Sequence, residues 1–132
     1  MAVPTPTEVA DRLYDRWNTD GLSVCADSVD PAIELICDPL RPDETALRGI
    51  EGWQQWVARW EEGYEAMHIT VDGLVPVDHE HVLALVSISA TPRGGHHPLR
   101  WAAAHLWCVR NGRIARWETH LDLGAARRTL EI

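Results

Sequence analysis

One stretch, from Leu99 to Leu121, constrains the fold more than any other. It reads LRWAAAHLWCVR, then Asn111-Gly112, then RIARWETHL. The Asn-Gly dipeptide favours a type I′ turn, because both central residues of that turn need a positive φ. The flanking runs are rich in Trp, Val, Ile and Thr, which suit a half-buried pleated surface. The sequence therefore predicts two long antiparallel strands joined by a two-residue turn.

Side-chain alternation predicts which residues of this hairpin face inward, because successive side chains of a strand point to opposite faces. The predicted inward set is Trp101, Ala103, His105, Trp107 and Val109 on the first strand, and Trp117, Thr119 and Leu121 on the second. An aromatic face with a single imidazole indicates the wall of a core or of a ligand pocket. Glu118 and His120 have the spacing of an acid/base pair, but alternation turns them away, toward the surface or a dimer interface.

Composition excludes several function classes. The 132 residues fit a single domain, 1–132, and the net charge of -8 argues against a nucleic-acid partner, because phosphate binding needs a basic surface. All 12 basic residues are Arg, so Schiff-base catalysis by a lysine is excluded. Cys25, Cys37 and Cys108 are too few and too scattered for a disulfide framework or a zinc motif, and we expect reduced thiols.

The chain carries no sequence signal for a membrane. No apolar run approaches the ~20 residues that a membrane span requires. The N-terminal MAVPTPTEVADRL has neither the basic region nor the apolar region of a signal peptide. We therefore expect a cytoplasmic protein without a membrane partner.

Helices are predicted first along the chain. Thr5-Pro6-Thr7-Glu8 has the pattern of a capping box with proline at the first helical position, and a short second helix is expected over Leu22 to Ser28. Trp53, Trp56, Val57, Trp60 and Tyr64 have the spacing of the inner face of a long amphipathic helix.

Strands are predicted mainly in the second half. They are expected at Ala32 to Cys37, His68 to Leu74 and Val82 to Thr91, followed by the hairpin, and Asp122 is expected to cap a short terminal helix. Helices first and strands later, without strand–helix alternation, predict an α+β domain: a curved antiparallel sheet with helices packed on its concave face.

Four stretches in this order resemble the nuclear transport factor two-like superfamily and its SnoaL-like polyketide cyclase branch. They are RLYDRWNTDGL, Asp38-Pro39 after the first strand, ALRGIEGW before the long helix, and RNGRIARWETHLD. The resemblance implies a conical pocket between the helices and the concave sheet face, and a homodimer formed through the outer face. Proteins of this fold carry out many reactions, and some only bind ligands.

The resemblance also implies site residues. SnoaL-like cyclases use a histidine nine residues before the Ile of the last turn, which is His105 here. They use an aspartate five residues after that Ile, and this position holds Thr119, whose hydroxyl hydrogen-bonds but does not ionise near neutral pH. The implied substrate-binding positions are Tyr14, Trp17, Leu35, Cys37, Asp38, Trp60, Tyr64 and Trp117, to which the hairpin alternation adds Trp101 and Trp107.

Each of these residues also has a structural interpretation. His105 could be a buried core histidine, Asp38 could serve only its turn before a proline, and the tryptophans could simply fill the core. A ligand role is favoured for Trp60 and Trp117, and a core role for Trp53. The uncharged strand VLALVSIS argues against the charged middle-strand site of the epoxide hydrolases of this fold.

Three functions follow as hypotheses. The first is a cofactor-free cyclase, isomerase or lyase acting on a hydrophobic, ring-containing small molecule, plausible in secondary metabolism, with His105 transferring a proton and Thr119 orienting the substrate. The second is a non-catalytic protein that binds such a molecule. The third is an interaction scaffold that works through the outer sheet face.

Two histidine clusters resemble metal ligands, namely His79-Glu80-His81 and His96-His97. Both are predicted to lie in turns and lack a third ligand at helical spacing, so the sequence favours solvated loop histidines and no metal or other cofactor.

The aromatic residues allow two arrangements of the pocket. Either the rings line an open cone with His105 and Thr119 near its floor, or they fill the cone and leave no space for a ligand. The sequence favours the open cone, because ordinary core filling would recruit Phe, and this chain has none.

Overall fold

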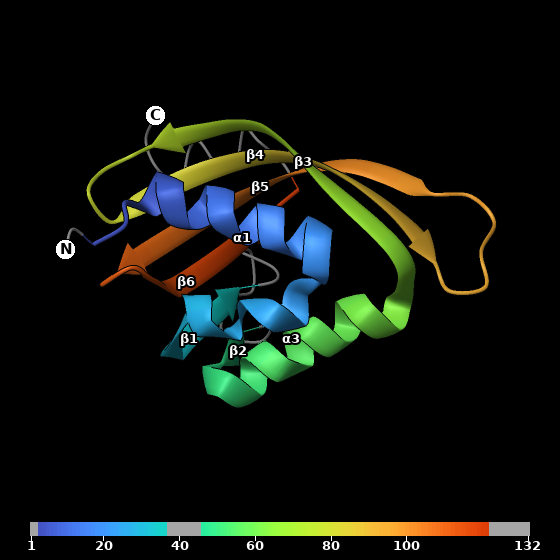
Figure 1. The fold of residues 1–132 in the computed structure, drawn as a ribbon, viewed down its shortest axis with the longest axis horizontal. Helices are drawn as coiled ribbons and strands as arrows, with labels where there is room; N and C mark the ends of the chain where they lie inside the picture. Colours follow the sequence, from blue (N-terminus) through green and yellow to red (C-terminus); the bar gives the residue numbers. More distant parts are fainter. Residues whose placement is uncertain (1–2, 37–45, 122–132) are drawn as a thin grey trace.

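A six-stranded sheet with two α-helices against one of its faces makes up the part of the fold that the structure describes (Figure 1). The structure is a computed structural model that describes residues 3–36 and 46–121. Its elements are α1 (Pro6–Asp20), the 3-10 helix η1 (Leu22–Ser28), β1 (Val29–Ile36), β2 (Ala46–Arg48), α3 (Gly49–Gly63), β3 (Tyr64–Pro76), β4 (His81–Pro92), β5 (Leu99–Arg110) and β6 (Arg113–His120).

The strand order is β2-β1-β6-β5-β4-β3. The α+β class is confirmed, but the sheet is mixed and not purely antiparallel, because β1 pairs in parallel with β6. A parallel pair needs a long crossover connection, and here nearly the whole chain between β1 and β6 supplies it. Strand periodicity alone does not reveal which partner a strand takes, so the sequence could not distinguish this arrangement.

The predicted hairpin is confirmed. Asn111 and Gly112 have φ of 53° and 75°, as a type I′ turn requires. Trp107 pairs with Trp117 across the two strands, and the alternation places both rings in the main core. Leu121, which was expected to face inward, lies beyond the end of β6 and is 73% exposed.

The two α-helices lie on the same face of the sheet as those rings. The Thr5 hydroxyl accepts the Glu8 backbone N–H at 3.2 Å and forms the predicted capping box of α1. Helix α1 crosses β3, β4 and β5, whereas α3 packs on β1 and β2 (Figure 1). One apolar core joins both helices to the sheet, which confirms the predicted layering.

Several predicted boundaries were wrong. Tyr64 is the first residue of β3 and not the last of the helical stripe, because α3 ends at Gly63. Strands β3 and β4 are longer than predicted, and β2 was missed because a three-residue edge strand has no detectable periodicity. The predicted terminal helix after Asp122, and the positions Cys37 and Asp38, lie outside the described residues.

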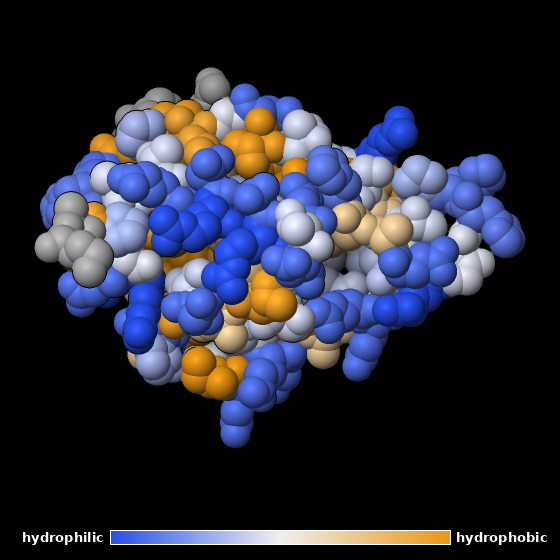
Figure 2. Space-filling view, viewed as in Figure 1, coloured by the Kyte–Doolittle hydropathy of each residue, from blue (hydrophilic) through white to orange (hydrophobic). Residues whose placement is uncertain are grey.

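Hydrophilic residues cover much of the face seen in Figure 2, with smaller apolar groups between them. Among the described helices, none is both long and apolar enough to cross a membrane.

Candidate functional site

A buried hydrogen bond joins α1 to the centre of β5. The Tyr14 hydroxyl lies 2.6 Å from His105 Nδ1, and both side chains are almost completely inaccessible to solvent. Tyr14 belongs to the apolar stripe of α1, and alternation along β5 turns His105 toward that stripe. The contact is therefore a product of helix and strand periodicity together, and neither segment indicates it alone.

Burial keeps both partners of this bond neutral. It lowers the pKa of His105 to about 3, with a smaller contribution from the charge of His120, and it raises the pKa of Tyr14 well above its usual value. A neutral imidazole has one N–H donor and one acceptor nitrogen. The tautomer whose Nδ1–H donates to Tyr14 therefore leaves a lone pair on Nε2, and the other tautomer accepts the Tyr14 proton and places an N–H there.

Tryptophan rings surround the histidine. The tryptophan cluster consists of Trp17, Trp53, Trp56, Trp60, Trp107 and Trp117. Trp117 is its hub: its ring centroid lies 4.8 Å from that of Trp107, 5.2 Å from the His105 ring and about 6 Å from those of three further members. Leu35 of β1 pairs with Trp117 and is buried beside it.

The interior of this cluster holds polar groups without partners. Within the described part of the chain, no hydrogen-bond partner is available to the indole N–H of Trp56, Trp60, Trp107 or Trp117, or to the hydroxyl of Thr119. Thr119 lies directly opposite His105 in the β5–β6 pairing. A buried donor left unpaired costs about 1–3 kcal/mol, so an ordinary core would contain few of them. Five unpartnered polar groups are therefore concentrated in this one region of the described core.

An open hollow of about 360 Å³ lies at the edge of the cluster. Its lining includes Trp17 and Trp60, together with Asn18, Tyr64, Glu65 and Met67. Trp60 stacks on Tyr64 with ring centroids 5.5 Å apart, which gives one side of the hollow an aromatic wall, and its ring also stacks on that of Trp101 at 6.3 Å. A cavity of this volume is at the lower end of the range that small-molecule sites occupy.

The open-cone prediction fits the mouth of this region and not its floor. His105 and Thr119 do not line this hollow, and Trp107 and Trp117 are 0% and 1% exposed. The reason is geometric: Trp107 and Trp117 are cross-strand neighbours whose rings pack on each other and on Tyr14, so they occupy the space beside the imidazole. Trp101, expected in the same pocket, borders a separate hollow with Arg100.

Two features of the region were not predicted from the sequence. Tyr14 was expected to bind substrate but not to pair with His105, and Trp56, expected on the inner face of the long helix, has an indole N–H without a partner within residues 3–36 and 46–121. Spacing places both residues on inward helical stripes, which is the only signal available. The partner of each stripe depends on how the helices cross the sheet.

The outer face of the same hairpin differs from the prediction in one respect. Glu118 and His120 do face away from the cluster, but His120 is only 4% exposed and was expected at the surface or at an interface. Its Nε2 lies 3.3 Å from Glu118, which also contacts Arg116 at 3.3 Å. Cross-strand packing against Ala104 of β5 contributes to this burial.

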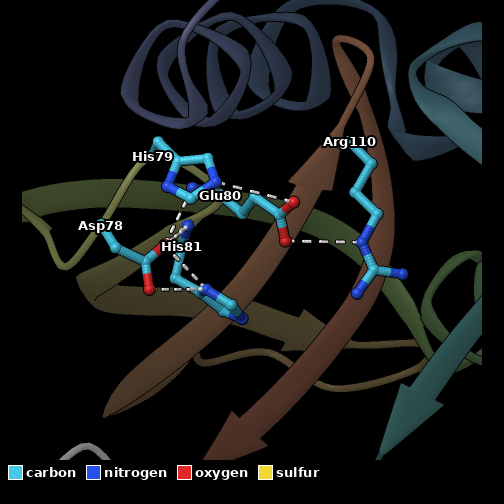
Figure 3. Close-up of polar contacts among 5 residues, drawn as sticks. All are labelled: Asp78, His79, Glu80, His81 and Arg110. Atoms are coloured by element: carbon cyan, nitrogen blue, oxygen red, sulfur yellow. Dashed lines mark hydrogen bonds and ion pairs between the residues drawn. The ribbon is translucent and has the colours of Figure 1, made fainter.

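The start of β4 brings together residues that the sequence placed in a solvated turn. His81 is the first residue of β4 and pairs directly with Cys108 of β5. Figure 3 shows its ring against the carboxylate of Asp78, with Glu80 extending toward Arg110. Cys108 and Cys25 are free, buried thiols, as expected for reduced cysteines. Neither His79 nor His81 has a place in the tryptophan cluster.

Comparison with known proteins identifies the family. The SnoaL-like domain model matches residues 10–117. A putative SnoaL-like polyketide cyclase from Jannaschia sp. is 19% identical, with a TM-score of 0.72 over 98% of this chain and 97% of that chain. An NTF2-like protein of unknown function from Burkholderia pseudomallei is 16% identical, with a TM-score of 0.73 over 96% and 97%.

TerC, co-crystallised with polyporic acid, has a TM-score of 0.72 at 16% identity, over 96% of this chain and 98% of that chain. At these identities the likeness concerns the fold. A search of curated protein sequences finds no match. The family match covers most of the chain, including Tyr14, His105 and five members of the tryptophan cluster besides Trp117, which is its last residue. The chain has the fold of the NTF2-like proteins, and it belongs to the SnoaL-like domain family.

Proposed function

We propose that the protein is a cofactor-free enzyme that moves a proton on a hydrophobic, ring-containing small molecule, as a cyclase, isomerase or lyase does. The observation that carries the proposal is the buried 2.6 Å contact between the Tyr14 hydroxyl and His105 Nδ1. It orients an imidazole inside an aromatic region, and a general base needs its orientation fixed before its pKa matters.

In the proposed reaction, His105 Nε2 removes a proton from a carbon beside a substrate carbonyl. The tautomer in which Nδ1–H donates to Tyr14 provides the required lone pair. Negative charge then develops on the carbonyl oxygen, where indole N–H groups of the cluster and the Thr119 hydroxyl would donate hydrogen bonds. Return of the proton to another atom completes an isomerisation, and attack of the enolate carbon on a second carbonyl closes a ring.

The unpaired groups also support the substrate class. Indole N–H groups only donate hydrogen bonds, so a ligand that satisfies them carries acceptor oxygens such as ring carbonyls. The surrounding rings favour a flat, apolar framework. A carbon flanked by two carbonyls is a comparatively strong acid. A weakly basic histidine such as His105 can therefore remove a proton from it more easily than from other carbon atoms.

Access is the condition that the proposal must meet. The hollow beside Trp17 and Trp60 is open, whereas Trp117 lies between Trp17 and His105, at 6.0 Å from the first ring and 5.2 Å from the second. A substrate that enters through the hollow therefore reaches His105 only when rings of the cluster turn. Trp60 is the member best suited to turn, because it lies at the border between the core and the hollow.

Carbon–deuterium exchange tests the proposal without knowledge of the natural product. Ring-containing 1,3-dicarbonyl compounds are incubated with the protein in D₂O, and deuterium uptake above the uncatalysed rate is followed by NMR. We expect His105→Gln to lower the catalysed exchange by a factor on the order of 10²–10⁴, the usual contribution of a general base. His96→Gln, at an exposed loop position, is the matched control and should exchange normally.

A second function, non-catalytic binding of such a molecule, is favoured by Thr119 at the position where the family's cyclases have aspartate. Quenching of tryptophan fluorescence by the same compounds measures binding independently of chemistry. Binding without exchange or product over many hours favours this second function. Exchange in His105→Gln at the wild-type rate contradicts the catalytic role of His105.

We also propose that the protein is a cytoplasmic homodimer formed through the outer sheet face. Arg116 remains accessible there, whereas His120 does not. Light scattering at micromolar concentration should give twice the mass of 14.8 kDa, and the monomer mass would contradict the proposal. The third hypothesis, an interaction scaffold, would use this same face, and no other observation supports it.

A further inference from the structure

Three side chains with different ligand atoms meet where β4 begins. They are Glu80, His81 and Cys108, and one ligand atom of each lies within 4.8 Å of the other two. The backbone fixes this meeting: His81 pairs with Cys108 across β4 and β5, and the Val109 N–H donates to the Glu80 carbonyl at 2.6 Å. Cys108 lies 27 positions after His81 in the sequence, so local spacing could not identify it as the third ligand.

Asp78 orients the histidine of this group. Its carboxylate accepts the backbone N–H of Glu80 at 2.8 Å and that of His81 at 2.9 Å, and it lies 2.9 Å from His81 Nδ1 (Figure 3). With Nδ1–H donated to Asp78, the lone pair of a neutral ring is on Nε2. A carboxylate in this position behind a histidine is the usual arrangement at protein metal centres.

We propose that Glu80, His81 and Cys108 bind a divalent transition-metal ion of the zinc class, with solvent in the fourth coordination position. The ligand set of one thiolate, one imidazole and one carboxylate suits such an ion, and three protein ligands leave one position open. The inference does not depend on the proposed function.

The distances are close to those of a bound ion. Ligand atoms at 2.0–2.3 Å from a tetrahedral zinc are separated by about 3.3–3.8 Å, so the group has to contract by ~1 Å. Glu80 is free to do this, because its present contacts are long: 3.5 Å to Arg110 and 3.8 Å to His79 (Figure 3). An ion would replace Arg110 as the partner of the Glu80 carboxylate.

The surroundings of Cys108 keep its thiol protonated as long as no cation is bound. Burial raises the pKa of Cys108, which keeps the thiol protonated when no cation is near, and Glu80 and Asp78 add to that effect, while Arg110 and Arg116 oppose it. A bound divalent cation reverses this preference and releases the proton. Solvent reaches the group because Glu80 borders a hollow of about 370 Å³ that Arg110 also lines.

The site lies on the opposite face of the sheet from His105. Cys108 follows Trp107, whose ring belongs to the tryptophan cluster, so the two side chains point to opposite faces. An ion there would fasten the beginning of β4 to β5 beside the hairpin turn. It would act on stability and not on the proposed chemistry.

Cobalt(II) tests the inference directly. The intact protein, freed of metal by a chelator, is titrated with CoCl₂, and a thiolate-to-cobalt charge-transfer band in the near ultraviolet is expected. Zinc chloride should abolish the band by displacement. Cys108→Ser should remove the band, and His81→Gln should weaken cobalt binding by roughly tenfold or more.

Two matched variants separate this site from chance binding. Cys25→Ser changes the other described free thiol, and His79→Gln changes a neighbouring histidine whose side chain is 89% exposed, and both should bind cobalt like the wild type. If Cys108→Ser fails to fold, His81→Gln and Glu80→Gln decide the matter, because both positions are partly exposed. An unchanged band or affinity in His81→Gln, or an equal loss in His79→Gln, overturns the inference.

Discussion

The β5–β6 hairpin has a buried histidine on each of its faces, and the two are supported differently. On the outer face, Glu118 contacts His120 and Arg116, each at 3.3 Å, and Arg116 continues to Glu34 at 3.7 Å. On the inner face, His105 has the neutral hydroxyl of Tyr14. The outer polar groups thus find charged partners within the chain.

The inner polar groups do not. In the part of the chain covered by residues 3–36 and 46–121, the Trp107 and Trp117 indoles and the Thr119 hydroxyl have no hydrogen-bond partner. Buried polar groups are normally satisfied, and unsatisfied ones are expensive. The difference between the faces teaches that the described chain satisfies the buried polar side chains of the outer face and leaves those of the inner face without partners, which is what the proposed ligand would supply.

The largest expected effect comes from the hub of the inner face. Trp117→Ala removes a ring that contacts five others, so we expect the free energy of unfolding to fall by ~3–5 kcal/mol in urea denaturation. Arg116→Ala, next in sequence but on the outer face and 41% exposed, should cost less than about 1 kcal/mol. A loss below ~1 kcal/mol for Trp117→Ala would show that the rings line an open pocket, and would restore the open-cone arrangement.

The next effect concerns the partner of His105. Tyr14→Phe leaves Nδ1 of a buried imidazole without its hydrogen bond, so we expect a loss of about 1–3 kcal/mol in the free energy of unfolding. Tyr64→Phe, at the half-buried mouth, is the matched control, and thermal denaturation compares the two. Equal melting temperatures for both variants would mean that the 2.6 Å contact contributes nothing to stability.

The third effect depends on pH. The pKa of His105 is about 3 in the folded chain and ~6.5 when unfolded, so below pH 6.5 the unfolded chain binds a proton that the folded chain does not. The free energy of unfolding should therefore fall as the pH decreases from 6.5 toward 3, by roughly 1 kcal/mol per pH unit from this residue. It should be independent of this residue above pH 7.5.

His105→Gln isolates that contribution. The difference in unfolding free energy between wild type and variant should slope between pH 6 and 4 and be flat above neutrality. His96→Gln, at an exposed loop position, serves as the control. A difference curve for His105→Gln that is flat throughout would show that His105 takes up its proton while folded, which is incompatible with its burial.

The smallest effect tests the unpaired hydroxyl. Thr119→Val keeps the shape and removes an oxygen that has no partner among the described residues, so stability should stay constant or rise by less than ~1 kcal/mol. Binding of 1,3-dicarbonyl compounds should weaken at the same time, as measured by fluorescence quenching. Destabilisation with unchanged binding would assign the hydroxyl to structure.

Sequence patterns predicted most of this fold because its strongest signals are local. The Asn111-Gly112 turn, the Thr5 capping box and the alternation that turns His105 inward each depend on a few neighbouring residues. What spacing could not provide is contact between distant segments. The Tyr14–His105 hydrogen bond spans 91 positions, and the His81–Cys108 pairing depends on strand register.

The burial of individual side chains could not be predicted from the sequence either. Alternation assigned His120 to the correct face, but only the packing of whole strands determines that a residue of that face is inaccessible. The ring packing beside His105 is similar, since tryptophan indicates bulk and a flat surface without indicating which neighbour fills the space. The sequence thus identified residues of the candidate site but not how their side chains pack together.

The parallel pairing of β1 with β6 also sets an order for folding. Val29 pairs with Ile114, so the strand that ends the N-terminal part cannot join the sheet until the last strand exists. The hairpins from β3 to β6 pair with sequence neighbours and can assemble first, because short loops close quickly whereas distant contacts form slowly. During synthesis β1 leaves the ribosome long before β6, and until β6 exists β1 lacks its parallel partner, whereas α1 can already pack on β3, β4 and β5. We therefore expect a slow refolding phase limited by the docking of β1 on β6.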